Sequence, residues 1–156
     1  MLNSSQQSVL IVDDTPANLH LLSRMLSLCG YRVRAANSGA RALAAIRANP
    51  PDLILLDIMM PEMNGYEVCE QLKTDEQTRD IPVIFISALD TMEDKIKAFT
   101  AGGVDYVTKP FQGKEVLARV KTHLAVRRMQ KNLEEKDVQL EQEIAERKRA
   151  ERDLHR

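Results

Sequence analysis

Five residues with charged or nucleophilic side chains directly follow short apolar or β-branched segments of this chain of 156 residues. They are Asp13, Asp14, Asp57, Ser87 and Lys109. Three carboxylates gathered in one place would repel one another unless a hard divalent cation lay among them. A set of oxygen ligands favours Mg²⁺. The residue types therefore indicate a magnesium site, provided that the fold brings these positions together.

These side chains are also the set that a phosphoryl group requires. Mg²⁺ and the ammonium group of Lys109 would neutralise charge on the phosphoryl oxygens, and the Ser87 hydroxyl would donate a hydrogen bond to a third oxygen. The Asp57 carboxylate would act as the nucleophile. The chemistry that these residues predict is the formation of an aspartyl phosphate.

Parallel strands would place all of these residues at one edge of a sheet. Five segments are predicted as strands: 9–12, 31–36, 52–57, 82–87 and 104–108. The first, third and fourth contain runs that are apolar throughout, which is typical of strands buried on both faces of a parallel sheet. The second strand alternates between apolar and polar residues, and we expect it to be more exposed.

Helical patterns separate the predicted strands. Thr15 is expected to cap the first helix, which should end near Gly30, and Ser38 opens the second. Two more helices are predicted at 66–73 and 92–101. Alternating strands and helices indicate an open, doubly wound α/β sheet, in which functional sites form at the carboxyl ends of the strands.

Four motifs make the chain resemble the receiver domains of bacterial two-component response regulators. They are VDD at 12–14, LLDIMMPEMNGYE at 55–67, PVIFISA at 82–88 and AGGVDYVTKPF at 101–111. The resemblance covers roughly residues 8–126. It implies a flavodoxin-like, five-stranded parallel sheet with the strand order 2-1-3-4-5, to which this chain adds a long C-terminal α-helical extension.

The resemblance implies a metal-binding or phosphate-binding role for several residues. Asp57 is the expected phosphoacceptor. Asp14 and the main-chain carbonyl of Met59 are expected to bind Mg²⁺ directly together with Asp57, while Asp13 helps through a water molecule. Lys109 is expected to contact the phosphoryl group.

A switch is implied as well. Ser87 and Tyr106 match the family's switch pair, in which the hydroxyl moves toward the phosphate and the aromatic ring swings inward behind it. A cis peptide bond between Lys109 and Pro110 is also implied.

The last 43 residues form a different kind of segment, because they contain no Gly, Pro, Phe or Tyr. One continuous helix is predicted from about Gly113 onward. Its heptad row consists of Val126, Leu133, Leu140, Arg147 and Leu154, with Ile144 at the alternate seam position. The pattern favours a parallel coiled-coil dimer. The alternative is a solvated single helix held by ion pairs between residues four positions apart.

Three parts are expected along the chain. They are a disordered N-terminus at 1–7, the receiver domain at 8–126 and a helical coiled-coil linker at 127–156. The segment 140–154 resembles the signalling helices that join receivers to other domains, so an output domain is expected beyond the linker.

The expected activity is that of a regulatory phosphoacceptor, which is not an enzyme with a substrate of its own but promotes its own phosphorylation and dephosphorylation. The implied partner is a sensor histidine kinase or a phosphotransfer protein. A homodimer is expected through the C-terminal helix, through the face formed by segments 92–101, 104–108 and the helix after Gly113, or through both.

Two other functions start from the same acidic residues. A haloacid-dehalogenase-like phosphatase also forms an aspartyl phosphate, but that class places an acid two residues after the nucleophile, where this chain has Met59. A purely structural module with an idle acidic site is disfavoured, because Asp57, Ser87 and Lys109 are all present.

Composition argues against several further classes. The first predicted strand leads into no GxGxxG motif, so dinucleotide binding has no support. A formal net charge of -1 gives no electrostatic reason to expect nucleic acid as a partner. No apolar run is long enough to span a membrane, and the polar N-terminus does not resemble a signal peptide. Cys29 and Cys69 form no disulfide or zinc motif, and we therefore expect a reducing cytoplasm.

Overall fold

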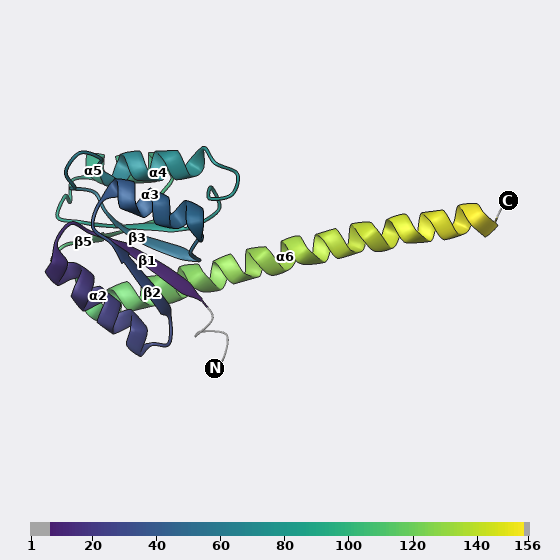
Figure 1. Cartoon of the computed structure of the whole chain (residues 1–156), viewed down its shortest axis with the longest axis horizontal. Coiled ribbons are helices and arrows are strands. Elements are labelled where there is room, and N and C mark those ends of the chain that lie inside the picture. The colour runs from purple at the N-terminus through teal and green to yellow at the C-terminus, as the bar shows by residue number, and fades with distance from the viewer. Residues whose placement is uncertain (1–6, 155–156) are drawn as a thin grey trace. The chain divides into compact units, whose positions relative to one another are not determined.

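Five parallel strands form a single sheet in the order β2-β1-β3-β4-β5 (Figure 1). The computed structural model describes residues 7–154 of the chain. Its elements, in chain order, are β1 (Ser8–Val12), α2 (Pro16–Leu28), β2 (Arg32–Ala36), α3 (Gly39–Ala48), β3 (Leu53–Asp57), α4 (Gly65–Lys73), β4 (Val83–Ser87), α5 (Met92–Thr100), β5 (Asp105–Thr108) and α6 (Gly113–Leu154). The predicted α/β fold, strand order and long C-terminal helix are confirmed. The disorder predicted for residues 1–7 falls outside the described residues except at Gln7, whose carbonyl accepts the main-chain N–H of Arg32 at 2.9 Å.

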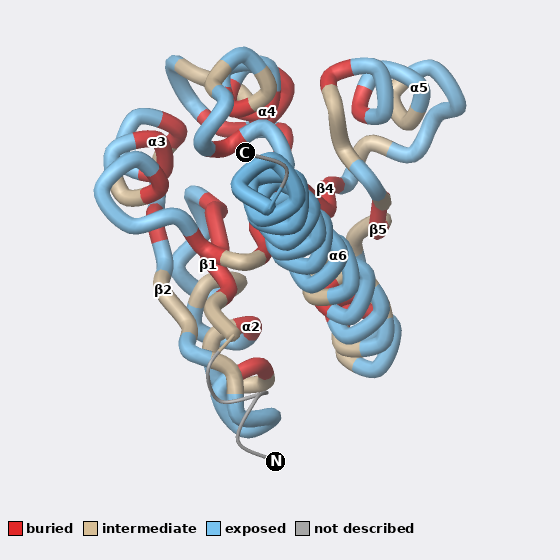
Figure 2. The backbone as a smooth tube through the Cα atoms, turned by 90° about the vertical axis from the view of Figure 1, so that its right-hand side faces the viewer, coloured by how far each residue is buried: buried red, intermediate tan, exposed pale blue. Residues whose placement is uncertain are grey.

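Burial along the strands follows the pattern of the sequence. All residues of β3 and β4, and all but the first of β1, are buried, as their uninterrupted apolar runs predict. Strand β2 lies at the edge of the sheet and is buried only at Ala36, which agrees with its alternating sequence. Figure 2 shows the buried strand β1 between the helices that cover the sheet.

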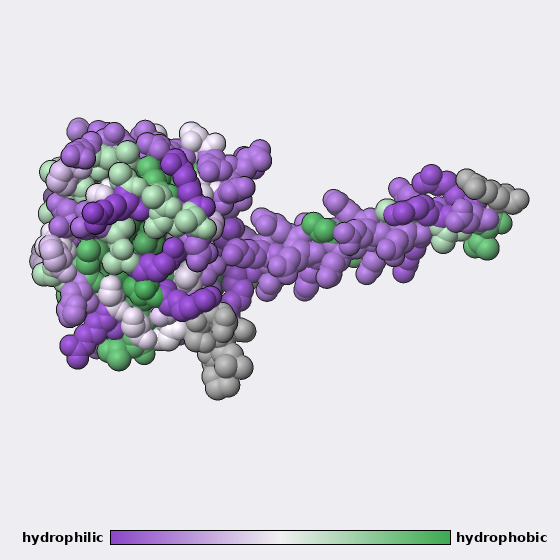
Figure 3. Space-filling view, in the orientation of Figure 1, coloured by the Kyte–Doolittle hydropathy of each residue, from purple (hydrophilic) through white to green (hydrophobic). Residues whose placement is uncertain are grey.

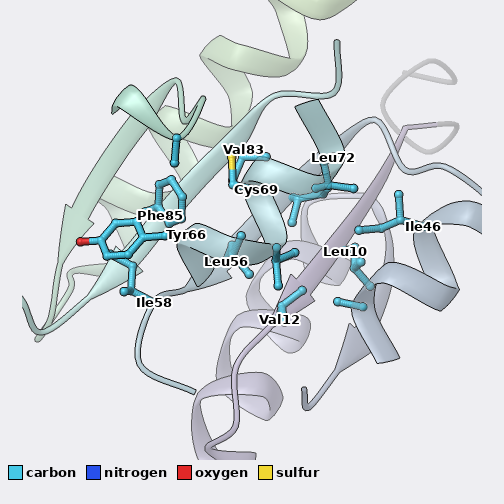
Figure 4. Packing of buried hydrophobic residues seen from close by; sticks show 14 of the residues in the cluster. Leu10, Val12, Ile46, Leu56, Ile58, Tyr66, Cys69, Leu72, Val83 and Phe85 are labelled. Carbon is cyan, nitrogen blue, oxygen red and sulfur yellow. The ribbon is translucent and has the colours of Figure 1, made fainter. Parts of the chain in front are cut away.

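The sheet carries one hydrophobic core on each face, because successive side chains of a strand point to opposite sides. On one face, Leu10 and Val12 of β1 pack with residues of α3, α4 and α5. On the other face, Val9 and Ile11 pack with residues of α2 and α6. Figure 4 shows part of the first core, around Phe85. Each fully buried Val, Leu, Ile or Phe side chain contributes about 1.5–3 kcal/mol to the free energy of unfolding. The packing of these apolar side chains therefore fixes where the strand ends lie.

Helices α3 and α2 differ in how their first turns are capped. Ser38 accepts a hydrogen bond from the N–H of Arg41, which is consistent with its predicted place at the start of α3. Thr15 is the N-cap residue of α2, as predicted, but its side chain makes no capping hydrogen bond. The carboxylate of Asp13 accepts the main-chain N–H of Thr15 at 2.9 Å and so fixes the start of α2.

The chain divides into two compact units, and α6 contributes to both. The first unit ends at Leu124 and the second begins at Ala125. Within the first unit, Val116, Val120 and Leu124 of α6 are buried against the sheet, as their helical spacing predicts. Beyond Arg128, every described residue of the helix is exposed. Among residues 7–154, no helix is long and apolar enough to cross a membrane.

Gly65 opens α4 directly against the end of β3, and we expect Gly65→Ala to be costly. A Cβ on Gly65 would lie 2.4 Å from the carbonyl oxygen of Asp57 and 2.8 Å from the Cα of Ile58. Main-chain atoms cannot yield as the end of a side chain can, so the free energy of unfolding should fall by about 2–4 kcal/mol in chemical denaturation. Gly113→Ala is the matched control, since its Cβ would meet only the flexible end of Met25. Equal losses in the two variants would contradict this interpretation.

Candidate functional site

The carboxyl ends of β1 and β3 bring Asp13, Asp14 and Asp57 together. One carboxylate oxygen from each of the three residues lies within 4.8 Å of the other two. The parallel register explains this, because Val12 stands opposite Leu56 and the acidic residues follow directly. Asp13 and Asp57 are 2% and 4% exposed, whereas Asp14 is at the surface. Three oxygen ligands with one member open to solvent fit a hard divalent cation.

Lys109 lies beside the same carboxylates, just after β5. Its Nζ is 3.0 Å from Oδ2 of Asp13 and 3.5 Å from Oδ2 of Asp57. The main-chain N–H of Lys109 donates to the carbonyl of Ser87 at 2.8 Å, and the peptide bond to Pro110 is cis, as the resemblance implies. One ammonium group therefore offsets part of the charge of two buried carboxylates, which would be costly to bury unpaired.

The electrostatics of the site set the protonation of Asp57. Its pKa is raised to about 6, chiefly because burial disfavours the charged form and secondly because Asp13 lies close by. The charge and hydrogen bond of Lys109 oppose this rise, as does a main-chain hydrogen bond with Met59. Additional positive charge would favour the ionised carboxylate, which is the nucleophilic form.

Asp13 is held in position by the first turn of α2. Its Oδ1 accepts the main-chain N–H of Thr15 at 2.9 Å, and its Oδ2 accepts the side-chain amide of Asn18 at 3.2 Å. With Lys109 on the same oxygen, Asp13 has three partners and a fixed orientation. Sequence analysis did not identify Asn18, because a polar residue in the first turn of an exposed helix carries no distinctive signal.

Ser87 and Tyr106 meet at the main chain of Leu89. Ser87 ends β4, is fully buried, and its Oγ accepts the N–H of Leu89 at 3.3 Å. The hydroxyl of Tyr106 donates to the carbonyl of the same Leu89. Tyr106 is 8% exposed as a residue, so its side chain occupies an inward position in this structure. A movement of the Leu89 main chain would therefore change the hydrogen bonds of both side chains.

A second tyrosine, not identified from the sequence, holds helix α5. The hydroxyl of Tyr66 donates to the carbonyl of Asp94 at 3.2 Å, and Nζ of Lys97 lies 5.1 Å from the centre of the Tyr66 ring. Ala98 is the one buried residue within α5. Because so little apolar surface anchors α5, these polar contacts carry much of its attachment.

Met59 follows the candidate nucleophile by two positions, and its side chain is 61% exposed. Its main-chain carbonyl as a metal ligand stays a prediction. The structure thus brings Asp13, Asp14, Asp57 and Lys109 into one cluster, while Ser87 ends the neighbouring strand β4.

Comparison with known proteins identifies the family. The chain matches the family described as "Response regulator receiver domain" over residues 9–121, and it belongs to that family. It is therefore a receiver domain of two-component response regulators, a regulatory, phospho-accepting signalling module.

Two curated relatives and one solved structure illustrate the similarity. The DNA-binding dual master transcriptional regulator RpaA of Synechocystis is 46% identical over 116 residues, covering 74% of this chain and 48% of that protein. A Vibrio cholerae protein named probable cyclic di-GMP phosphodiesterase is 44% identical over 147 residues, covering 94% of this chain and 33% of that protein. The receiver domain of the Francisella response regulator 1452 has 34% identity and a TM-score of 0.72, covering 76% of this chain and 97% of that chain. The chain thus spans half or less of the length of these curated relatives.

Replacing Asp57 by asparagine should stabilise the metal-free protein at neutral pH. The folded-state pKa of Asp57 lies above its ordinary value of 3.8, so the folded protein binds the proton more tightly. The free energy of unfolding therefore falls as pH rises from about 4 to about 6, and the charged carboxylate costs the fold about 3 kcal/mol above that window. We expect Asp57→Asn to raise the Tm at about pH 7.5 in EDTA, where the charged carboxylate is present, and to give a smaller gain at about pH 4, where Asp57 is already largely neutral.

Asp14→Asn is the control for this experiment, because it removes the same charge from an exposed position. We expect its Tm to stay near that of the wild type. A Tm gain for Asp57→Asn that is the same at both pH values would show that the carboxylate charge is not the cause.

Removing the hydroxyl of Tyr66 should loosen α5. Tyr66→Phe keeps the aromatic ring, whose centre lies 5.9 Å from the centre of the Phe85 ring. It deletes the hydrogen bond from the Tyr66 hydroxyl to the carbonyl of Asp94. A hydrogen bond contributes about 1 kcal/mol net, so amide hydrogen exchange within α5 should become about three- to tenfold faster. The amides of α3 serve as the internal control. Unchanged exchange in α5 would mean that other contacts hold the helix.

Proposed function

We propose that Asp57 is the phosphoacceptor and that Mg²⁺ makes its phosphorylation possible. The observation that carries the proposal is the burial of Asp57 between a second carboxylate and an ammonium group. Asp13, Asp14, Asp57 and the main-chain carbonyl of Met59 would hold the cation. An ion at this position supplies the positive charge that ionises Asp57 and neutralises the phosphoryl oxygens.

Lys109 would bind a phosphoryl oxygen once the group is attached. Its Nζ already lies within 3.5 Å of Asp57, so it needs to move little to reach an oxygen bound to that carboxylate. Because these charges come from the domain itself, the receiver would promote both its own phosphorylation and the later attack of water on the aspartyl phosphate. The phosphodonor is the phosphohistidine of a sensor histidine kinase or of a phosphotransfer protein.

Phosphorylation would reach the surface through Leu89. The Ser87 hydroxyl now accepts the N–H of Leu89, and it would leave that partner to donate to a phosphoryl oxygen. The loop between β4 and α5 would then shift, and with it the carbonyl that Tyr106 binds. Ser87 and Tyr106 would thereby convert a local charge change into a different position of α5, by shifting an existing equilibrium.

The remainder of the chain would connect this switch to an output. We assign residues 8–126 to the receiver and 127–156 to a coiled-coil linker that leads to an output domain. The match to the Vibrio cholerae protein supports a linker, since it covers 147 residues and so extends beyond the receiver. A homodimer would form through the C-terminal helix, through the face of α5, β5 and α6, or through both. The exposed Met92, Ile96 and Phe99 support the second surface.

The cytoplasm is the proposed location. Cys29 and Cys69 are both free thiols, one exposed and one buried, which fits a reducing compartment.

Intact mass after incubation with acetyl phosphate and Mg²⁺ tests the proposed chemistry. We expect the wild type to gain about 80 Da, the mass of one phosphoryl group, and Asp57→Asn to gain nothing. Lys109→Ala is the second variant, which should still be folded but should no longer couple phosphorylation to a change in α5. A stoichiometric adduct on Asp57→Asn would place the phosphoacceptor elsewhere. If the wild type gains no mass, a titration with beryllofluoride and Mg²⁺ distinguishes rapid hydrolysis from an idle site.

A further inference from the structure

The part of α6 beyond Leu124 presents a narrow apolar stripe to solvent. Its members are Val126, Leu133, Leu140, Ile144 and Leu154, each between 43% and 82% exposed. Figure 3 shows this part of the helix as largely hydrophilic, with isolated hydrophobic residues. A stripe of this width matches the seam of a two-stranded coiled coil and is too narrow to face a globular core.

We propose that this part of α6 pairs with α6 of a second copy of the chain, in a parallel and in-register coiled coil selected by Lys136 and Glu141. The inference rests on the dimer proposed above and gives its orientation and register. One row of the seam consists of Val126, Leu133, Leu140, Arg147 and Leu154, and the other of Gln130, Asp137, Ile144 and Glu151. The first row occupies heptad position d and the second row occupies heptad position a.

Lys136 and Glu141 have no opposite charge to pair with on their own helix. Charged side chains on a helix pair with residues three or four positions away. Those positions hold Asn, Leu, Gln and Leu around Lys136, and Asp, Val, Ile and Ala around Glu141. The nearest charge to Glu141 at such a spacing is Asp137, which repels it. Both residues flank the seam, so a partner helix is where each can find an opposite charge.

The parallel register supplies these opposite charges. Lys136 occupies heptad position g and Glu141 the following position e, which face each other across a parallel, in-register pair. Glu143 and Lys148 stand in the same relation one heptad later. Since the dimer is symmetric, each relation occurs twice, which gives four attractive pairs and no repulsive pair between these positions.

An antiparallel pairing gives a poorer charge pattern. With Leu133 of one copy opposite Ile144 of the other, positions e face positions e and positions g face positions g. Lys136 then faces Glu143, but Glu134 faces Glu141 and Arg127 faces Lys148. Two attractive pairs are set against four repulsive ones over the symmetric dimer. Charge complementarity therefore selects the parallel orientation.

Charged residues interrupt the apolar core of the parallel seam. Asp137 faces its own copy between the layers of Leu133 and Leu140, and like charges there weaken the pair. Farther along, Arg147 and Glu151 occupy successive layers, so that opposite charges are adjacent. Replacing Asp137 by leucine should tighten dimerisation at least tenfold, whereas Glu135→Leu, on the outward side of the helix, should have little effect.

Charge exchange between two variants of the full chain tests the register. Lys136→Glu and Glu141→Lys each turn two attractive pairs into repulsive ones, so the Kd of each homodimer in sedimentation velocity should rise about tenfold. An equimolar mixture should dimerise as the wild type does, because each variant then offers the charge that the other lacks. Arg149→Glu, on the outward side, is the control for Lys136→Glu.

Each outcome of this experiment decides something about the seam. Weak homodimers that the mixture does not rescue would overturn the parallel, in-register pairing. If neither the wild type nor Asp137→Leu dimerises through the helix, with or without beryllofluoride and Mg²⁺, a second copy is not the partner and the proposed helix dimer fails too. Phosphorylation of Asp57 is measured separately by mass, so its failure is distinguishable from both.

Discussion

The arrangement of the whole receiver depends on keeping two carboxylates, Asp13 and Asp57, buried side by side at the carboxyl edge of the sheet. Burial and mutual repulsion both raise the pKa of Asp57, and one ammonium group from Lys109 offsets only part of the cost. A protein interior tolerates such a cluster when a cation or a new covalent group completes the charge balance. In the proposed function, this unbalanced charge would make the site responsive to metal and to phosphate.

The proposed switch would have a short route from this site to the surface. The main chain of Leu89 binds Ser87 through its N–H and Tyr106 through its carbonyl, so a change at one side chain bears on the other. Helix α5 follows directly and buries little more than Ala98, while Tyr66 ties down its first turn. An element with so few apolar contacts can change position at a low free-energy cost, whereas the densely packed α3 and α4 cannot.

The C-terminal part of α6 also has an incomplete set of stabilising contacts. Its apolar stripe is interrupted by Asp137 and Arg147, so the helix has too little apolar surface for a strong dimer and too much for a solvated rod. A weak coiled coil responds to small changes in the domains attached to it, because a few kilocalories per mole decide its association. In the proposed dimer, charged flanking residues would fix the orientation, which apolar residues alone leave open.

The amino-acid sequence by itself predicted the strands and the polar residues at their ends, because continuous apolar runs are typical of a doubly covered parallel sheet and each run leads into a polar residue. The order of the strands was implied only by the resemblance to receiver domains. Tertiary structure decided what depends on contacts between distant segments. It showed that the Asp13 carboxylate binds the main-chain N–H of Thr15, that Asn18 and Lys109 share an oxygen of Asp13, and that Tyr66 holds α5. Such pairings leave no periodic signal in the sequence, since each joins single side chains whose meeting depends on how the helices pack.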